Sequence, residues 1–249
     1  GQDASAPKAE RPATVAATIN SATITAGEVR ISTSNAPDAK ATSDSGSGGI
    51  VSGSGAETYV EIDTDTSTTL GDTGTVTVIA DTLRLSTGQS ATVGSNIDTV
   101  SAAAIGKSGA LSDTDVTSNV TSRIGGMAVL EADNLALSAN NAVARPENGF
   151  NITSGSGGAL DIPAMKSTVN VTATTDMMVD GGAKLTQTGF AGNNQTFQIG
   201  TYTDMALTDR QKLDAGGAIA IPIGNSRITV DKNDAKVTIG AAEIFSVDD

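Results

Sequence analysis

A ten-residue segment of this chain occurs three times, and the repeat restricts what the chain can fold into. Residues 24–33 (ITAGEVRIST) match residues 78–87 (VIADTLRLST), which match residues 130–139 (LEADNLALSA), at spacings of 54 and 52 residues. Each copy keeps apolar residues at its first, sixth and eighth positions, Ala at its third and Ser at its ninth. Repeated units that cannot bury their own apolar side chains stack on their neighbours to form a continuous core.

A second repeated segment supports the same unit length. Residues 158–163 (GALDIP) match residues 217–222 (GAIAIP) at a spacing of 59, and residues 49–51 form a weaker third copy. The alternating pairs that follow, Val169 with Val171 and Ile228 with Val230, keep the spacing of 59. The chain is therefore predicted to consist of units of about 50–60 residues.

Within the units, apolar residues alternate with polar ones, and Val, Ile and Thr are frequent, which is typical of β-strands. Gly-rich segments such as residues 45–49 and 154–158 separate these stretches and predict turns. Only residues 203–213 predict a helix, with a Thr-Asp start and Gly residues after the end. We expect an all-β fold with at most one short helix.

A parallel β-helix, or solenoid, fits such units best. With about 20 residues assumed per coil, each unit would hold two or three coils, and about a dozen coils would stack to roughly 55–60 Å. Only six residues are aromatic, so the core would consist of thin layers of Ile, Val and Leu. A β-sandwich or jelly roll is the alternative, because alternation does not distinguish parallel from antiparallel strands.

Composition excludes several functional classes. The chain has no Cys and no His, which excludes disulfides, thiolate zinc sites and a Ser-His-Asp triad. A net charge of −13 argues against nucleic acid as a partner. No apolar run approaches the roughly 20 residues of a membrane span. High acidity and an abundance of Ser, Thr, Asn and Gly favour an exported protein.

Two segments resemble the repeats of filamentous-haemagglutinin-like adhesins, namely residues 76–88 (VTVIADTLRLSTG) and residues 169–186 (VNVTATTDMMVDGGAKLT). The resemblance covers approximately residues 20–190. It implies a right-handed parallel β-helix that is secreted and displayed on a bacterial surface.

We expect three regions: a flexible arm over residues 1–12, which contains Pro7 and Pro12, a repeat β-domain over residues 13–189, and a C-terminal region over residues 190–249. The last region holds four of the six aromatic residues: Phe190, Phe197, Tyr202 and Phe245. They predict either a cap that covers the last strand edges or a contact between subunits. The protein would then be a homo-oligomer or polymer joined through its ends or its arm.

The best metal candidates are the acidic residues Glu61, Asp63, Asp65 and Asp72. Carboxylates are the ligands that Ca²⁺ prefers, so we expect a structural calcium site here, with a solvated acidic face as the alternative. The segment is not an EF-hand, because Thr68 and Gly74 replace the required Gly and Glu. No other cofactor is expected.

The leading functional hypothesis is a non-enzymatic extracellular structural or adhesive protein at the cell surface, with a surface glycan or another cell-surface molecule as its ligand. One alternative is a self-assembling subunit of an extracellular filament, sheath or virus-like fibre. A second alternative is a β-helical polysaccharide-active enzyme, in which paired carboxylates such as Asp113 and Asp115 would act as acid and base.

Overall fold

A computed structural model describes residues 7–147, 151–189 and 195–246. They form thirteen strands of one sheet: β1 (Lys8–Ile19), β2 (Ala22–Asn35), β3 (Asp38–Leu70), β4 (Val76–Ile124), β5 (Ala128–Arg145), β6 (Asn151–Gly157), β7 (Leu160–Val179), β8 (Lys184–Gln187), β9 (Phe197–Leu207), β10 (Gln211–Ala215), β11 (Ile219–Ala220), β12 (Ile223–Ile239) and β13 (Glu243–Ser246). The predicted all-β class is confirmed. The helix predicted over residues 203–213 is wrong, because β9 and β10 occupy this segment.

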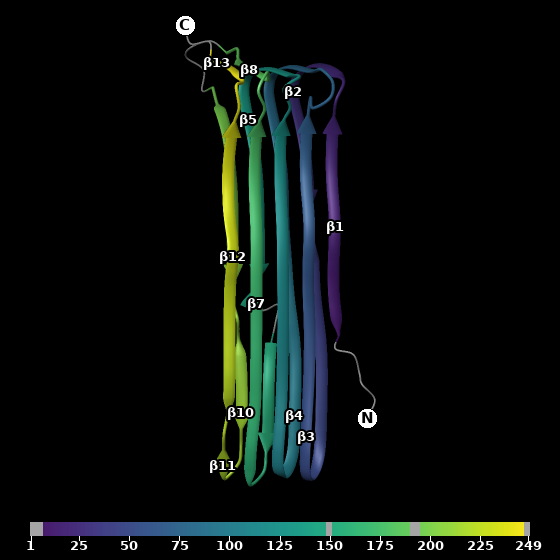
Figure 1. Cartoon of the computed structure of the whole chain (residues 1–249), viewed down its shortest axis with the longest axis vertical. Helices are drawn as coiled ribbons and strands as arrows, with labels where there is room; N and C mark the ends of the chain where they lie inside the picture. The colour runs from purple at the N-terminus through teal and green to yellow at the C-terminus, as the bar shows by residue number, and fades with distance from the viewer. Residues whose placement is uncertain (1–6, 148–150, 190–194, 247–249) are drawn as a thin grey trace.

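Every strand pairing among the described residues is parallel. The chain runs down one long face, turns at the bottom of the view within β3 and β4, and returns up the other face (Figure 1). Short strands, including β8 and β13, lie across the top (Figure 1). The antiparallel arrangement of a sandwich or jelly roll is therefore not what these residues form.

The register of the ladders reproduces the sequence repeat. Val29 pairs with Leu83, and Leu83 pairs with Leu135, so the three copies of the first repeat lie side by side. Paired residues are 51 apart between β1 and β3 and 62 apart between β5 and β9. The assumed coil of about 20 residues is wrong, because one full unit separates neighbouring strands. Each face alone takes up about 20 residues, as in β7, or about 65 Å at the usual rise of a strand.

The interior alternates between apolar and polar zones along the strands. Three separate clusters of buried aliphatic residues form the core, the largest of which contains Leu83, Leu85, Leu135 and Leu137. Between these clusters, buried hydroxyl groups bond across the interior: Thr87 donates to Thr68 at 2.7 Å, and Thr68 donates to Thr33 at 2.7 Å. A slip of one residue would expose the apolar set, so the alternation holds each strand in register.

The two ends of the sequence take part in the same sheet. Residues 8–12, which fall in the expected arm, belong to β1 and pair with residues 59–63 of β3. In the expected C-terminal region, β9 pairs with β5, β12 with β7, and β13 with β8. The described part of residues 190–249 therefore continues the ladders of the repeat region.

Candidate functional site

The four predicted metal ligands do not converge. Glu61, Asp63 and Asp65 alternate along the outer face of β3, where successive side chains on one face are about 6.6–7 Å apart. Asp72 lies beyond the end of this strand, and its carboxylate is 2.9 Å from Nη1 of Arg123. Within the part of the chain that the structure describes, no three acidic side chains are grouped to hold a metal ion. Calcium binding at these residues stays a prediction.

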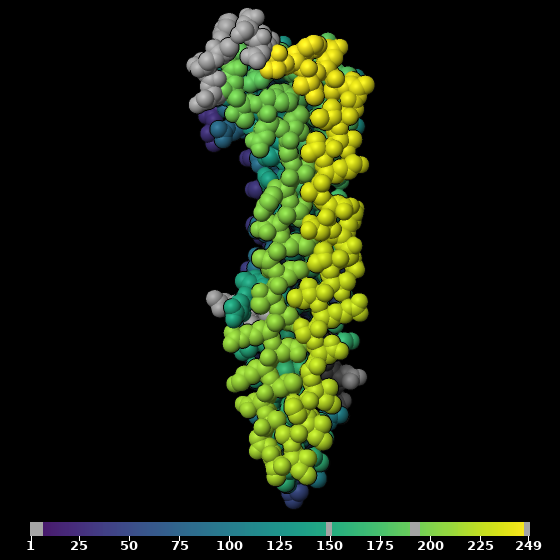
Figure 2. Space-filling model, turned by 90° about the vertical axis from the view of Figure 1, so that its left-hand side faces the viewer, coloured from purple at the N-terminus to yellow at the C-terminus, as the bar shows by residue number. Residues whose placement is uncertain are grey.

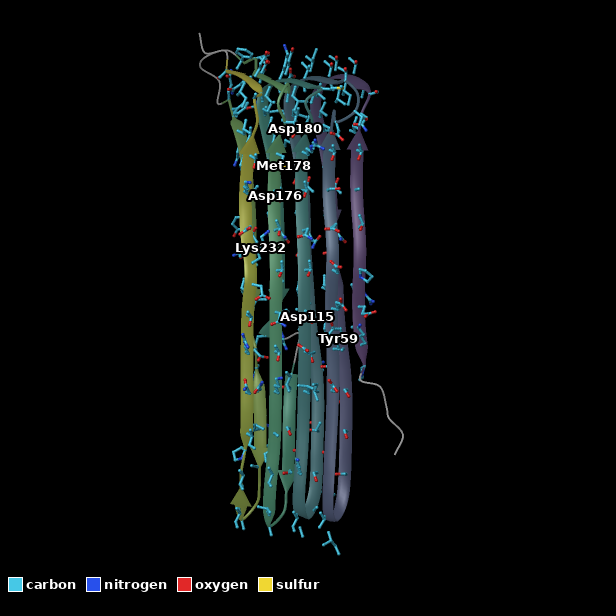
Figure 3. All side chains as sticks on the ribbon, viewed as in Figure 1. Tyr59, Asp115, Asp176, Met178, Asp180 and Lys232 are labelled. Atoms are coloured by element: carbon cyan, nitrogen blue, oxygen red, sulfur yellow. The ribbon has the colours of Figure 1, made fainter. Side chains whose placement is uncertain are left out.

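Instead, Glu61 belongs to a polar network that crosses the outer face around Tyr59. The Tyr59 hydroxyl donates to carboxylate oxygens of Glu61 at 3.3 Å and of Asp115 at 3.2 Å. Lys8 Nζ lies 4.7 Å from the centre of the Tyr59 ring and 3.4 Å from the Glu61 carboxylate. Asn170 donates to the other oxygen of Asp115 at 2.8 Å. The network spans β1, β3, β4 and β7, and Tyr59 and Asp115 lie close together in Figure 3.

The electrostatics of this network raise the pKa of Tyr59, whose phenol is neutral at pH 7. Partial burial, and then the negative charges of Asp115 and Glu61, raise the pKa of Tyr59 to about 12. A phenol of this kind donates hydrogen bonds but supplies no phenolate nucleophile near pH 7. The arrangement therefore suits polar recognition or cross-strand stabilisation.

The carboxylate pair of the enzyme hypothesis lies on the same face. Desolvation, followed by the charge of Asp115, raises the pKa of Asp113 above its ordinary value. A raised pKa is one property of a general acid, yet geometry has to agree with it. A cavity of about 660 Å³ nearby is lined by Glu57, Leu111 and Lys166 among others, and neither Asp113 nor Asp115 contributes to its wall.

Near the end of β4, Arg123 contacts acidic residues that follow the ends of the two neighbouring strands, β3 and β7. Its guanidinium lies 2.9 Å from Asp72 and 2.6 Å from Asp180, and Nε donates to Asp180 at 2.8 Å. The hydrogen bond to Asp180 is the main cause that raises the pKa of Arg123. All three side chains are about one-third exposed, so we interpret the contact as a surface clamp between neighbouring units.

The aromatic residues expected to form a cap or contact lie apart. Phe197 is half-buried against the largest core cluster, whereas Tyr202 on the same strand is 61% exposed. Phe245 lies on β13 and is 55% exposed. Phe190 falls outside the described residues. Phe197 thus packs into the core, and Tyr202 and Phe245 remain available at the surface.

Sequence reasoning missed a buried ion pair. The guanidinium of Arg145 lies 3.5 Å from the carboxylate of Asp209, and their side chains are 0% and 3% exposed. Ser167 donates to Asp209 at 3.0 Å, and Ser226 also donates to it. The available signal was alternation, since Arg145 follows the core residue Val143 at an interval of two.

Comparisons of the chain with protein-family models, curated proteins and solved structures find no match. Among the described residues, no helix is long and apolar enough to cross a membrane.

Proposed function

We propose that the chain is a right-handed parallel β-solenoid and acts as a non-enzymatic extracellular protein, structural or adhesive, at the cell surface. The solenoid is supported by the all-parallel ladders and by the spacing of 51–62 residues between partners. Each unit of the sequence would then be one wide coil, with two long faces and a short top.

The observation that carries the functional proposal is the fixed pattern of polar side chains on the outer face. Asn119 donates to Asp65 at 3.0 Å, Asn170 donates to Asp115 at 2.8 Å, and Arg123 binds Asp180. The first two bonds join side chains at the same height on adjacent strands, which lie about 4.8 Å apart, whereas Arg123 is in register with Met178 and reaches Asp180 just beyond the end of β7. Regular rows of ordered polar groups suit contact with a glycan or another extended surface at several points, and they require no catalytic group.

Immunogold electron microscopy of the source cells tests this function. Antibodies raised against the purified chain should label intact cells, and the purified chain should bind defined glycans or whole cells. A variant with Asp65→Ala, Asp115→Ala and Asn170→Ala should fold and bind more weakly. Labelling that requires permeabilised cells would overturn the proposal.

A second candidate function, the filament subunit, is favoured by the exposed edge of β12. Its side chains continue the columns of β7, since Ile228 pairs with Val169 and Ile239 pairs with Val179. Ile228 and Ile239 are 40% and 48% exposed, and this edge runs along most of the molecule (Figure 2). A strand added from a second copy would bury them.

Two features would limit such growth. The Tyr59 N–H donates to Pro7 O, and the Gly71 N–H donates to Ile19 O. The backbone N–H and C=O groups of odd-numbered residues in β1 therefore point towards β3, and those of even-numbered residues point towards the open edge. Pro12 therefore faces the open edge, where it offers no N–H donor. The successive pairings place Pro12 at the height of Lys232, where the register of β12 shifts. Prolines and bulges on edge strands oppose pairing with other chains.

Light scattering and electron microscopy of the purified chain test self-assembly. Concentration-dependent fibres that disappear in Val237→Lys would support the filament subunit, because Val237 lies on the exposed edge. A monomer at every concentration would reject it and leave the first proposal standing.

A further inference from the structure

Two stacked turns at the lower end of the molecule enclose a group of oxygen atoms. The first turn joins β6 to β7, and the second joins β10 to β11. Asp161, at the start of β7, is 0% exposed, and Ser156, at the end of β6, is 7% exposed. The N–H of Gly216 in the second turn donates to Asp161 Oδ2 at 2.8 Å and to the carbonyl oxygen of Ser156 at 3.3 Å. The shared donor places the carboxylate beside the backbone of Ser156.

The hydrogen bonding of this group is incomplete. Asp161 Oδ1 and Ser156 Oγ are both buried, and neither is hydrogen-bonded to any described residue. In the neighbouring turn, the equivalent Ser101 is satisfied, because its hydroxyl lies 2.8 Å from Ser52 Oγ. Leaving one carboxylate oxygen buried without a partner is costly, so an opposite charge or a polar molecule is expected beside it.

Gly106 packs closely beside these oxygens. Gly106 pairs with Asp161 in the ladder between β4 and β7. A Cβ on Gly106 would lie 3.3 Å from Ser156 Cβ, 3.4 Å from Ser101 Oγ and 3.6 Å from the Gly157 carbonyl oxygen. The Ser156 side chain, the Ser101 hydroxyl and the Gly157 carbonyl oxygen thus lie around Gly106, next to its ladder partner Asp161.

We propose that Asp161 and Ser156 bind a hard metal cation between these two turns. Oxygen ligands of this kind are those of Ca²⁺, and sites with little charge bind it with Kd of about 10⁻⁴–10⁻³ M. A single carboxylate with neutral oxygens fits this weak class. The site is distinct from Glu61, Asp63, Asp65 and Asp72, which lie on the outer face of β3 and just beyond it, and it does not depend on the proposed function.

Thermal unfolding and calorimetry with CaCl₂ as the probe test the site in buffer free of metal ions. With a Kd of about 1 mM, 10 mM Ca²⁺ should shift the folding equilibrium about 11-fold. For a chain of this size, that shift raises Tm by about 3–6 °C. Parallel measurements with NaCl and KCl at matched concentrations show which cation raises Tm. A rise in Tm with Na⁺ or K⁺ but not with Ca²⁺ would support the same site occupied by a monovalent ion.

Asp161→Asn should abolish the response, and Ser156→Ala should weaken the affinity several-fold, which keeps the test decisive if the first variant fails to fold. Asp214→Asn is the matched control, because Asp214 lies one strand away and is exposed. The joint variant Asp63→Asn with Asp65→Asn separates this site from the outer acidic face. No response to any cation would indicate a buried water molecule and overturn the proposal, as would a full response in Ser156→Ala and Asp161→Asn.

Discussion

Arg145 and Asp209 form an ion pair inside the molecule, with 3.5 Å between guanidinium and carboxylate and almost no exposure of either side chain. Desolvation lowers the pKa of Arg145, and the charge of Asp209 opposes this effect. Because either charge is costly to bury without the other, Asp209→Asn and Arg145→Met should each lower the free energy of unfolding by about 3–5 kcal/mol. Urea denaturation measures both.

The double variant provides the control for this prediction. Arg145→Met combined with Asp209→Asn should cost clearly less than the two single losses together. The exposed pair of Arg210 and Glu147, 3.2 Å apart, is the matched comparison, and Arg210→Met should change stability little. Equal losses of stability in Arg145→Met and Arg210→Met would contradict the argument that burial makes the first pair important.

The hydroxyl chain from Thr87 through Thr68 to Thr33 predicts non-additive effects. Thr68→Val leaves a donor on Thr87 and an acceptor on Thr33 without their shared partner, so it should cost about 1–3 kcal/mol. Replacing all three residues by Val removes every unsatisfied group and should cost less than the sum of the single changes. A multiple-mutant cycle in urea measures this, and strictly additive losses would rule out the coupling.

Tyr59 should lose its proton at a higher pH than an ordinary tyrosine does. In a Tyr202→Phe background, ultraviolet absorbance should give a midpoint of about 12 for the native protein, against about 10 for an unfolded tyrosine. Since the folded-state pKa is the higher one, the stability contributed by neutral Tyr59 is complete below about pH 10 and is lost as the pH rises towards 12.

Asp115→Asn should move this midpoint towards 10, because it removes a negative charge next to the hydroxyl. A midpoint near 10 in the native wild-type protein would show that the network does not raise the pKa of Tyr59.

Gly125 should not tolerate a side chain. A Cβ there would lie 2.4 Å from the carbonyl oxygen of Gly71 and 2.6 Å from Asp72 Cα, so the stacked upper turns would have to separate. Gly125→Ala should cost about 1–3 kcal/mol in thermal unfolding. Gly88→Ala is the control within β4, because a Cβ there meets nothing within 4 Å. Equal losses in both variants would contradict this packing.

The repeats made much of the fold predictable. The matches among residues 24–33, 78–87 and 130–139 are the ladder register itself, because side chains at equivalent positions must fit into the same layer. The length of each straight segment could not be deduced, since alternation is the same whether a strand bends after six residues or after twenty.

The wrong helix and the missed ion pair have a physical cause in tertiary pairing. The local signals in residues 203–213 favour a helix, yet Met205 pairs with Val143 and Leu207 pairs with Arg145 in a ladder that outweighs them. Likewise, alternation after Val143 places Arg145 on the buried face, but nothing local identifies its partner Asp209, which is 64 positions away in the sequence. Three of the acidic candidates, Glu61, Asp63 and Asp65, alternate along β3, and the rise of the strand keeps their carboxylates apart, while Asp72 lies beyond the end of this strand.

The spacing of 51–62 residues between paired strands also determines how the chain must fold. No strand can form its first ladder hydrogen bond until a loop of more than fifty residues has closed, and this costs chain entropy before any stabilising contact exists. The relative contact order is about 0.2, which places folding in the millisecond-to-second range typical of non-local β-proteins. We therefore expect pairing of the first two neighbouring units to be the slow step of folding, because every later unit adds to an edge that is already ordered.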